Sequence, residues 1–362
     1  GSTNSHTAIL ARMMNIPALT GVLVNLDELR TGMTAVVDGF QGQVVLEPLE
    51  EFCERIKKKM QQEREEFELL QAFKGKADIT LDGRKLLVCA NIRSVEDVKS
   101  ALENDAGGIG LFRSEFLYLG RTDFPTEEEQ FQAYRQAAQA MEGKPVVIRT
   151  LDIGADKQAN FFHLEKENNP ALGYRAIRIC LRQPEIFQVQ LRALLRASVF
   201  GSLSILYPMI TSVKEIFQIR EIVEKTAREL KQAQVPYQIP KQGIMIETPA
   251  AVMISDELAS LVDFFSIGTN DLTQYTLAMD RQNEKLADFY DPRHKAILRM
   301  IQMTVDNAHR AGIRVGICGE LGADTELTEE FVRMGMDELS VPPSMILRVR
   351  KRIREIGENV DN

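Results

Sequence analysis

The stretch Gly243-Ile-Met-Ile-Glu247 is a short apolar run that ends in a carboxylate. Two later stretches have the same form, Phe264-Phe-Ser-Ile-Gly-Thr-Asn270-Asp271 and Arg314-Val-Gly-Ile-Cys318-Gly-Glu320. Each pattern predicts a short buried strand that delivers its polar group where the strand stops. A parallel barrel carries its catalytic groups at the C-terminal ends of its strands. Carboxylates and a thiol in these positions therefore predict an enzyme built on such a barrel.

From residue 84 onward the chain alternates apolar runs with helical patterns, which is typical of parallel β/α units. Helical patterns lie at Ser94–Glu103, Thr126–Met141, Ser212–Gln232, Pro292–Ala311 and Thr325–Met334, among others. Strands are predicted at 86–92, 108–113, 146–151, 204–209, 243–247, 264–269, 314–318 and 338–341. These α/β units have the number and size of a (β/α)₈ TIM barrel, and we assign the barrel to residues 79–362.

The beginning of the chain has a different character. A helix is expected over Ser5–Met14, and short β-like runs follow at 35–37 and 43–46. We interpret residues 1–48 as the C-terminal remnant of a domain that begins upstream. Residues 49–78 are dense in charge, with apolar side chains at helical spacing, and we expect a linker helix there.

The composition excludes several classes of protein. The net charge is −8, which argues against nucleic acid or an anionic membrane as the general partner. No apolar run approaches the ~20 residues that a membrane-inserted helix needs. The four cysteines are scattered without C-x-x-C spacing, so neither a disulfide framework nor a structural zinc site is predicted. A reducing cytoplasm fits this usage best.

Charged groups follow several of the predicted strands, and residues on one face of a barrel converge in space. Any one of them alone is more often structural, but their convergence favours a functional pocket. The acids Glu247 and Asp271 are hard oxygen ligands suited to Mg²⁺ or Mn²⁺. The arginines are permanent cations with forked donors, which predicts a small, doubly anionic substrate. They are Arg113, Arg149, Arg175 and Arg281.

Two further side chains suggest transfer chemistry. The Cys318 thiol lies opposite the proposed metal and could hand a proton to the carbon of an enolate. His6 opens a helix, where free N–H groups and the helix dipole favour an added phosphoryl group. Spacing alone makes His6 a weak candidate. We interpret His163, His294 and His309 as structural or solvated.

Short motifs extend this pattern over nearly the whole chain. They are Ser5-His6-Thr7-Ala8, Gly110-Leu-Phe-Arg113-Ser-Glu-Phe-Leu, Ile148-Arg149-Thr-Leu-Asp-Ile-Gly, Asn169-Pro-Ala-Leu-Gly-Tyr-Arg175, Ile246-Glu247-Thr-Pro-Ala, Gly268-Thr-Asn270-Asp271-Leu-Thr-Gln-Tyr, Asp280-Arg281 and Cys318-Gly-Glu320-Leu. With them the chain resembles the phosphoenolpyruvate–protein phosphotransferases, the enzyme I family of bacterial sugar phosphotransferase systems.

The resemblance implies a barrel that binds phosphoenolpyruvate (PEP), with Mg²⁺ on Glu247 and Asp271. It implies that the four arginines bind phosphate, carboxylate and enolate oxygens, with Asn270 assisting. His6 matches the family's phosphorylated histidine, and Cys318 matches the proton donor that converts enolpyruvate to pyruvate. It further implies a homodimer formed by the barrel and a phosphocarrier partner, HPr, which docks on a helical domain upstream.

The chain departs from the family in one motif. The family usually has Gly-Gly-Arg-Thr/Ala-Ser-His, whereas Gly1-Ser2-Thr3-Asn4-Ser5 precedes His6 here, so the arginine is absent. The strands that should support the His6 helix are also expected upstream. We therefore expect this fragment to bind substrate but to turn it over poorly.

Three alternatives stay open on the sequence. Pyruvate phosphate dikinase and phosphoenolpyruvate synthase share the barrel and the histidine, and differ by an upstream ATP-grasp domain. A metal-dependent lyase barrel could enolise pyruvate with similar acids and arginines, without His6. The chain could also serve as a ligand-sensing dimerisation module. The sequence upstream of residue 1 and a phosphotransfer assay on the full-length protein separate these alternatives.

Overall fold

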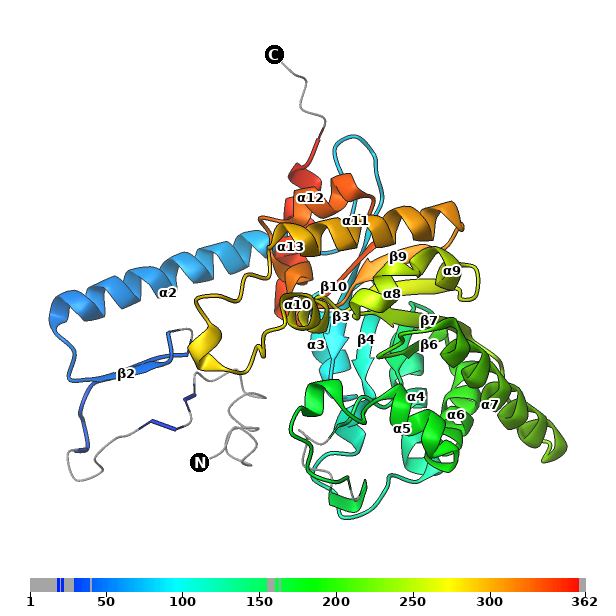
Figure 1. Ribbon diagram of the computed structural model, residues 1–362. Helices are drawn as coiled ribbons and strands as arrows, with labels where there is room; N and C mark the ends of the chain where they lie inside the picture. The colour runs from blue at the N-terminus through cyan, green and yellow to red at the C-terminus, as the bar shows by residue number, and fades with distance from the viewer. Residues whose placement is uncertain are drawn as a thin grey trace. The chain divides into compact units, whose positions relative to one another are not determined.

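The computed structural model describes residues 18–19, 21–22, 29–39, 41–154, 160–162 and 164–357 (Figure 1). The chain divides into two compact units, Gly1–Ala72 and Phe73–Asn362. The helix expected over 5–14, with His6, lies outside the described residues, and so does His163.

The first unit contains a β-hairpin and a long helix. Strands β1 (Ala35–Asp38) and β2 (Gln43–Leu46) pair antiparallel, and α2 (Glu50–Gln71) follows. The Asp38 carboxylate accepts a hydrogen bond from the Gln41 N–H at 3.0 Å and lies 3.5 Å from the Lys59 ammonium group. This carboxylate therefore closes the hairpin turn and links the hairpin to the helix.

The second unit is a closed barrel of parallel strands, in which β10 pairs with both β9 and β3. The strands are β3 (Leu87–Ile92), β4 (Ile109–Arg113), β5 (Val146–Arg149), β6 (Leu203–Tyr207), β7 (Lys241–Ile246), β8 (Phe264–Ile267), β9 (Arg314–Ile317) and β10 (Glu338–Val341). Each lies within two residues of its predicted start and end. The (β/α)₈ barrel predicted from the sequence is thereby confirmed.

Helices follow the strands and cover the outside of the barrel (Figure 1). They are α3 (Asp97–Glu103), α4 (Glu127–Ala140), α5 (Ile177–Arg182), α6 (Pro184–Ala197), α7 (Val213–Gln232), α8 (Pro249–Met253), α9 (Ser255–Ala259), α10 (Thr269–Leu277), α11 (Lys295–Arg310), α12 (Thr328–Met334) and α13 (Ile346–Glu355). None of the described helices combines the length and apolar character that a membrane crossing requires.

Capping groups set where several helices begin. Thr126 with Glu129 and Ser212 with Glu215 form capping boxes at the predicted starts of α4 and α7. Three helices, α3, α11 and α12, begin three residues later than the pattern suggested, and side-chain contacts explain two of these starts. The Asp97 carboxylate accepts the Arg93 and Ser94 N–H groups, which forms a turn before α3. The His294 imidazole accepts the Ala296 N–H and caps α11.

The strands divide their side chains between two faces, because successive residues of a strand alternate. One set packs with the helices in the main core, for example Ile148, Ile205 and Ile244. The other set forms a small apolar cluster inside the barrel, made of Leu111, Val147, Leu206, Met245 and Cys318 with Phe264 against it. The polar residues that follow the strands lie beyond this apolar cluster, which therefore forms the base of the candidate site.

The barrel interior also contains a partly buried acid, Glu338 of β10. A side chain at Gly110 would collide with its carboxylate and with the Ser340 hydroxyl, which explains the glycine. Burial raises the pKa of Glu338 to about 7, and the charge of Arg314 partly opposes this rise. The folded protein therefore holds this carboxyl group in its protonated form well above the pH at which an unfolded chain ionises it.

This pKa predicts a pH-dependent effect of Glu338→Gln. A raised carboxyl pKa contributes stability below the unfolded pKa, and that contribution is lost as pH rises toward 7. The Gln variant does not lose stability in this way. The difference in unfolding free energy, variant minus wild type, should therefore increase by on the order of 2 kcal/mol between pH 5 and pH 8. Urea denaturation at both pH values measures it. Glu355→Gln, which alters an exposed pair with Lys351, is the control. A difference independent of pH would contradict the prediction.

Candidate active site

Arg149 ends β5 and lies in a buried ionic cluster. Its Nη2 is 2.6 Å from Oε1 of Glu115, and its Nη1 is 2.9 Å from Oδ2 of Asp152. Burial opposes the charge of Arg149, yet Asp152 and Glu115 together hold its pKa above the ordinary value. The guanidinium group is therefore a fixed cation at the C-terminal edge of the barrel.

Arg175 joins the same cluster from the segment after β5. Its Nη2 lies 2.8 Å from Oδ1 of Asp152 and 3.5 Å from Oδ2 of Asp271. Asp152 thus bridges Arg149 and Arg175, one carboxylate oxygen to each. Burial opposes the charge of Arg175, but Asp152 and Asp271 raise its pKa above the ordinary value. The bridge holds two predicted anion-binding residues at a defined separation.

The other two predicted arginines lie around this pair. Nη2 of Arg281 is 3.8 Å from Oδ1 of Asp271, and the Arg281 side chain is 38% exposed. Arg113 ends β4, where burial and then the positive charge of Arg149 lower its pKa. A neighbouring anion would therefore favour the charged form of Arg113, and Arg281 is the most exposed of the four arginines.

Glu247 follows β7 and is almost completely buried, at 2% exposure. Its Oε1 accepts the Met209 N–H at 2.6 Å. Gly268 makes room for the other oxygen, because a Cβ at that position would lie 2.9 Å from Oε2. Burial, followed by the charges of Asp271 and Asp152, raises the pKa of Glu247 to about 8. Carboxylates are thus crowded together next to the arginines.

Cys318 follows β9 with its thiol buried in the barrel interior. The thiol donates to the Ile267 carbonyl at 3.6 Å, and burial raises its pKa to about 11. The carboxamide of Asn91 donates to the carbonyls of Cys318 and Ser340, at 3.1 and 3.0 Å. The backbone around the thiol is therefore held across three strands, and the sulfur keeps its proton at neutral pH.

Asn270 is oriented by Glu320 in two ways. The Glu320 N–H donates to Oδ1 of Asn270 at 2.8 Å, and Nδ2 of Asn270 donates to Oε1 of Glu320 at 3.0 Å. Both contacts require the same orientation of the amide. The second N–H of Nδ2 is consequently directed away from Glu320.

The structure thus brings the predicted acids, arginines and thiol to the C-terminal mouth of the barrel. Sequence reasoning missed the residues that connect them: Glu115, Asp152, Tyr275 and Glu320. One signal was available, because Asp152 follows Arg149 at a spacing of three residues. Among the other histidines, His309 lies 3.1 Å from Asp337, and His294 caps a helix.

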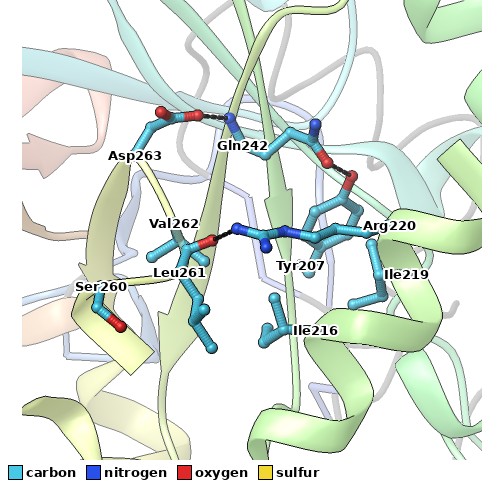
Figure 2. A pocket seen from close by; sticks show the side chains of 9 residues that line it. All are labelled: Tyr207, Ile216, Ile219, Arg220, Gln242, Ser260, Leu261, Val262 and Asp263. Carbon is cyan, nitrogen blue, oxygen red and sulfur yellow. Dashed lines mark hydrogen bonds between the residues drawn. The ribbon is translucent and has the colours of Figure 1, made fainter. Parts of the chain in front are cut away.

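A separate pocket of about 200 Å³ lies away from this cluster (Figure 2). It is formed by α7 and the segment before β8, and it includes Tyr207, Arg220, Gln242 and Asp263. The Tyr207 hydroxyl donates to Gln242 at 2.8 Å, and Arg220 donates to the Leu261 carbonyl at 2.5 Å. None of the predicted site residues lines this pocket.

Comparison with known proteins identifies the family. Residues 67–357 match the family described as "PEP-utilising enzyme, PEP-binding domain". Residues 1–42 match the family described as "PEP-utilising enzyme, mobile domain".

Several curated relatives carry the name phosphoenolpyruvate-protein phosphotransferase. Those from Priestia megaterium, Geobacillus stearothermophilus and Bacillus subtilis are 44%, 45% and 42% identical, each over 99% of this chain. The chain spans 63%, 62% and 63% of their respective lengths.

Among solved structures, a citrate lyase from Burkholderia xenovorans LB400 has a TM-score of 0.47 and 14% identity, over 76% of this chain and 79% of that one. This likeness is too distant to inform the site. The PEP-binding family match, in contrast, covers well over half of the sequence and includes every strand of the barrel. The chain therefore belongs to the PEP-utilising enzyme family.

Proposed function

We propose that this chain is the PEP-binding part of a phosphoenolpyruvate-protein phosphotransferase. In this proposal the barrel binds PEP, the phosphoryl group passes to a histidine, and pyruvate is released. The names of the relatives and the family match support it. The shared name of the relatives reported above favours this proposal over the pyruvate phosphate dikinase, phosphoenolpyruvate synthase and lyase alternatives.

The observation that carries the proposal is a pair of buried arginine donors. Nε of Arg149 and Nε of Arg175 are both buried, and neither has a hydrogen-bond partner among the described residues. Buried polar groups are almost always paired in folded proteins, so donors left over at a site point to a ligand. Guanidinium groups favour phosphate and carboxylate oxygens, and PEP offers both.

A divalent cation fits the acids of this site. Mg²⁺ is usually bound through only one or two carboxylates, with water and substrate phosphate completing its shell. In line with this, the described residues contain no cluster of three or more Asp, Glu, His or Cys side chains placed to hold a metal alone. Burial, followed by the charges of Asp271 and Asp152, raises the pKa of Glu247 to about 8, although Arg149 and Arg175 oppose the rise. Glu247 and Asp271 would hold Mg²⁺ or Mn²⁺, which would neutralise charge on phosphate and enolate oxygens.

The chain's own residues supply the remaining chemistry in this proposal. A ring nitrogen of His6 attacks phosphorus, the bond from phosphorus to the enol oxygen breaks with its electron pair on oxygen, and the enolate of pyruvate is left. The Cys318 S–H then gives its proton to the methylene carbon, which yields pyruvate and a thiolate. A thiol with a pKa of about 11 is protonated at neutral pH, as this step requires.

The partners belong to the same proposal. In the intact protein HPr would accept the phosphoryl group from the histidine, and the barrel would form a homodimer. A cytoplasmic location is proposed as well, since all four thiols are free and a reducing compartment keeps them so.

Two measurements test the function. Calorimetric titration of this chain with PEP in the presence of Mg²⁺ should show binding, and EDTA should abolish most of it. In the full-length protein with HPr, a lactate dehydrogenase-coupled assay should show pyruvate release. Binding of pyruvate but not of PEP, with no phosphorylated histidine formed, would favour a lyase instead.

A further inference from the structure

Tyr275 of α10 is a partly buried residue that neither the sequence pattern nor the proposed chemistry assigns a role. Its hydroxyl donates to the Ala171 carbonyl at 2.5 Å and accepts from Nη1 of Arg175 at 3.2 Å. A single O–H has one proton to give, so the contact with Arg175 is one that the hydroxyl receives. The hydroxyl therefore links the guanidinium group to the backbone of its own loop.

The loop that carries Arg175 needs such a link. Twenty residues separate the end of β5 from the short 3-10 helix of this loop, Pro170–Leu172. The Leu172 side chain is 66% exposed. Segments with few buried apolar contacts open easily. The hydroxyl of Tyr275 reaches this turn from α10, 104 residues away in the sequence.

The same tyrosine lies inside the electrostatic field of the site. Burial raises its pKa to about 12, Arg175 opposes the rise, and Asp271 and Glu247 add to it. It therefore stays a neutral phenol at physiological pH. Its oxygen is also 3.7 Å from the sulfur of Met209, the residue whose N–H binds Glu247. The Tyr275 hydroxyl thus contacts Arg175, which is proposed to bind the anion, and Met209, whose N–H binds the proposed metal ligand Glu247.

We propose that Tyr275 is a positioning residue that holds the Arg175 guanidinium and the 170–172 turn together for binding of the substrate anion. The inference rests on the proposed function of Arg175. Asp152 takes Nη2 of Arg175 and Tyr275 takes Nη1, which leaves Nε as the buried nitrogen without a partner among the described residues. Tyr275 and Asp152 thereby fix the orientation of the Arg175 guanidinium group.

The test is Tyr275→Phe, which removes the hydroxyl and keeps the ring. PEP binding with Mg²⁺, measured by calorimetry on this chain, should weaken about tenfold or more, as for one lost hydrogen bond to a charged group. Tyr174→Phe is the matched control. It removes a hydroxyl from the residue next to Arg175, and that hydroxyl accepts a hydrogen bond from Nε2 of Gln183 at 3.3 Å. This control should change PEP affinity less than about twofold.

A double-mutant cycle separates positioning from general stability. In an Arg175→Lys background a single ammonium replaces both terminal nitrogens, so Tyr275→Phe should cost less than about twofold there. Equal losses in both backgrounds would show that Tyr275 acts independently of Arg175. Unchanged PEP affinity in Tyr275→Phe on the wild-type background would also overturn the proposal.

Hydrogen exchange gives a measurement that needs no ligand. The amides of Leu172 and Gly173 bond within the 170–172 turn, and they should exchange faster in Tyr275→Phe than in Tyr174→Phe. If these amides exchange at the same rate in both variants, Tyr275 does not hold the turn, whatever the binding data show. Failure of the wild-type chain to bind PEP would instead contradict the proposed function, and the exchange result would still test the link.

Discussion

Glu247→Gln and Asp271→Ala are each expected to weaken metal-dependent PEP binding by tens of fold or more. A ligand bound through a metal loses a charge-assisted contact when one carboxylate is removed, on the order of 2 kcal/mol. Glu247→Gln keeps an acceptor for the Met209 N–H, so the local backbone is preserved. The loss should therefore appear in binding and leave folding intact.

The melting temperatures of the unliganded proteins give a sharper comparison between the variants and wild type. Glu247 has a pKa of about 8 because burial and neighbouring carboxylates oppose its charge. An acid with this pKa is mostly protonated at pH 7 in the unliganded protein, so replacing it with Gln should leave the melting temperature of that protein unchanged or higher. The rise in melting temperature that Mg²⁺ and PEP produce should shrink with the affinity, as mass action requires. Asp256→Ala, at an exposed acid of α9, is the control. Full metal-dependent affinity in both site variants would disprove the metal assignment.

Cys318→Ala is expected to keep PEP binding but to slow proton transfer to carbon by a hundredfold or more, the range for a positioned general acid. Exchange of pyruvate methyl protons with solvent deuterium, followed by NMR in the full-length phosphorylatable protein, measures this step. The barrel offers a matched control in Cys89→Ala, which removes another buried thiol. Wild-type exchange rates in Cys318→Ala would exclude the thiol as proton donor.

The strands and the groups that follow them were predictable because both depend on local pattern. Short apolar runs bounded by turns predict buried parallel strands, and the barrel places their ends together without any pair of side chains being known. Arg149 and Glu247 could therefore be assigned to one mouth from strand order alone. Helix starts at Thr126 and Ser212 were predictable for the same reason, since a capping box spans only four residues.

Apart from the local spacing of Arg149 and Asp152, the residues that connect the site were not predictable, because their partners are distant in the chain. Asp152 meets Arg175 across 23 residues, and Asn91 reaches the Ser340 carbonyl across 249. A sequence pattern shows which residues are charged, but not which residue each of them pairs with in the folded protein. Tyr275 is the clearest example. Its position in the sequence of α10 does not distinguish it from any other partly buried aromatic residue of a helix.

The sequence by itself determined the barrel, the order of its strands and the chemical types at its mouth, since hydrophobic period and strand-end position are local properties. Only the tertiary structure decided how those groups are paired. Closing the barrel forces carboxylates and guanidinium groups together in a buried space, where Asp152 bridges Arg149 and Arg175 and the pKa of Glu247 rises. These outcomes depend on distance and burial, which exist only after the strands have met.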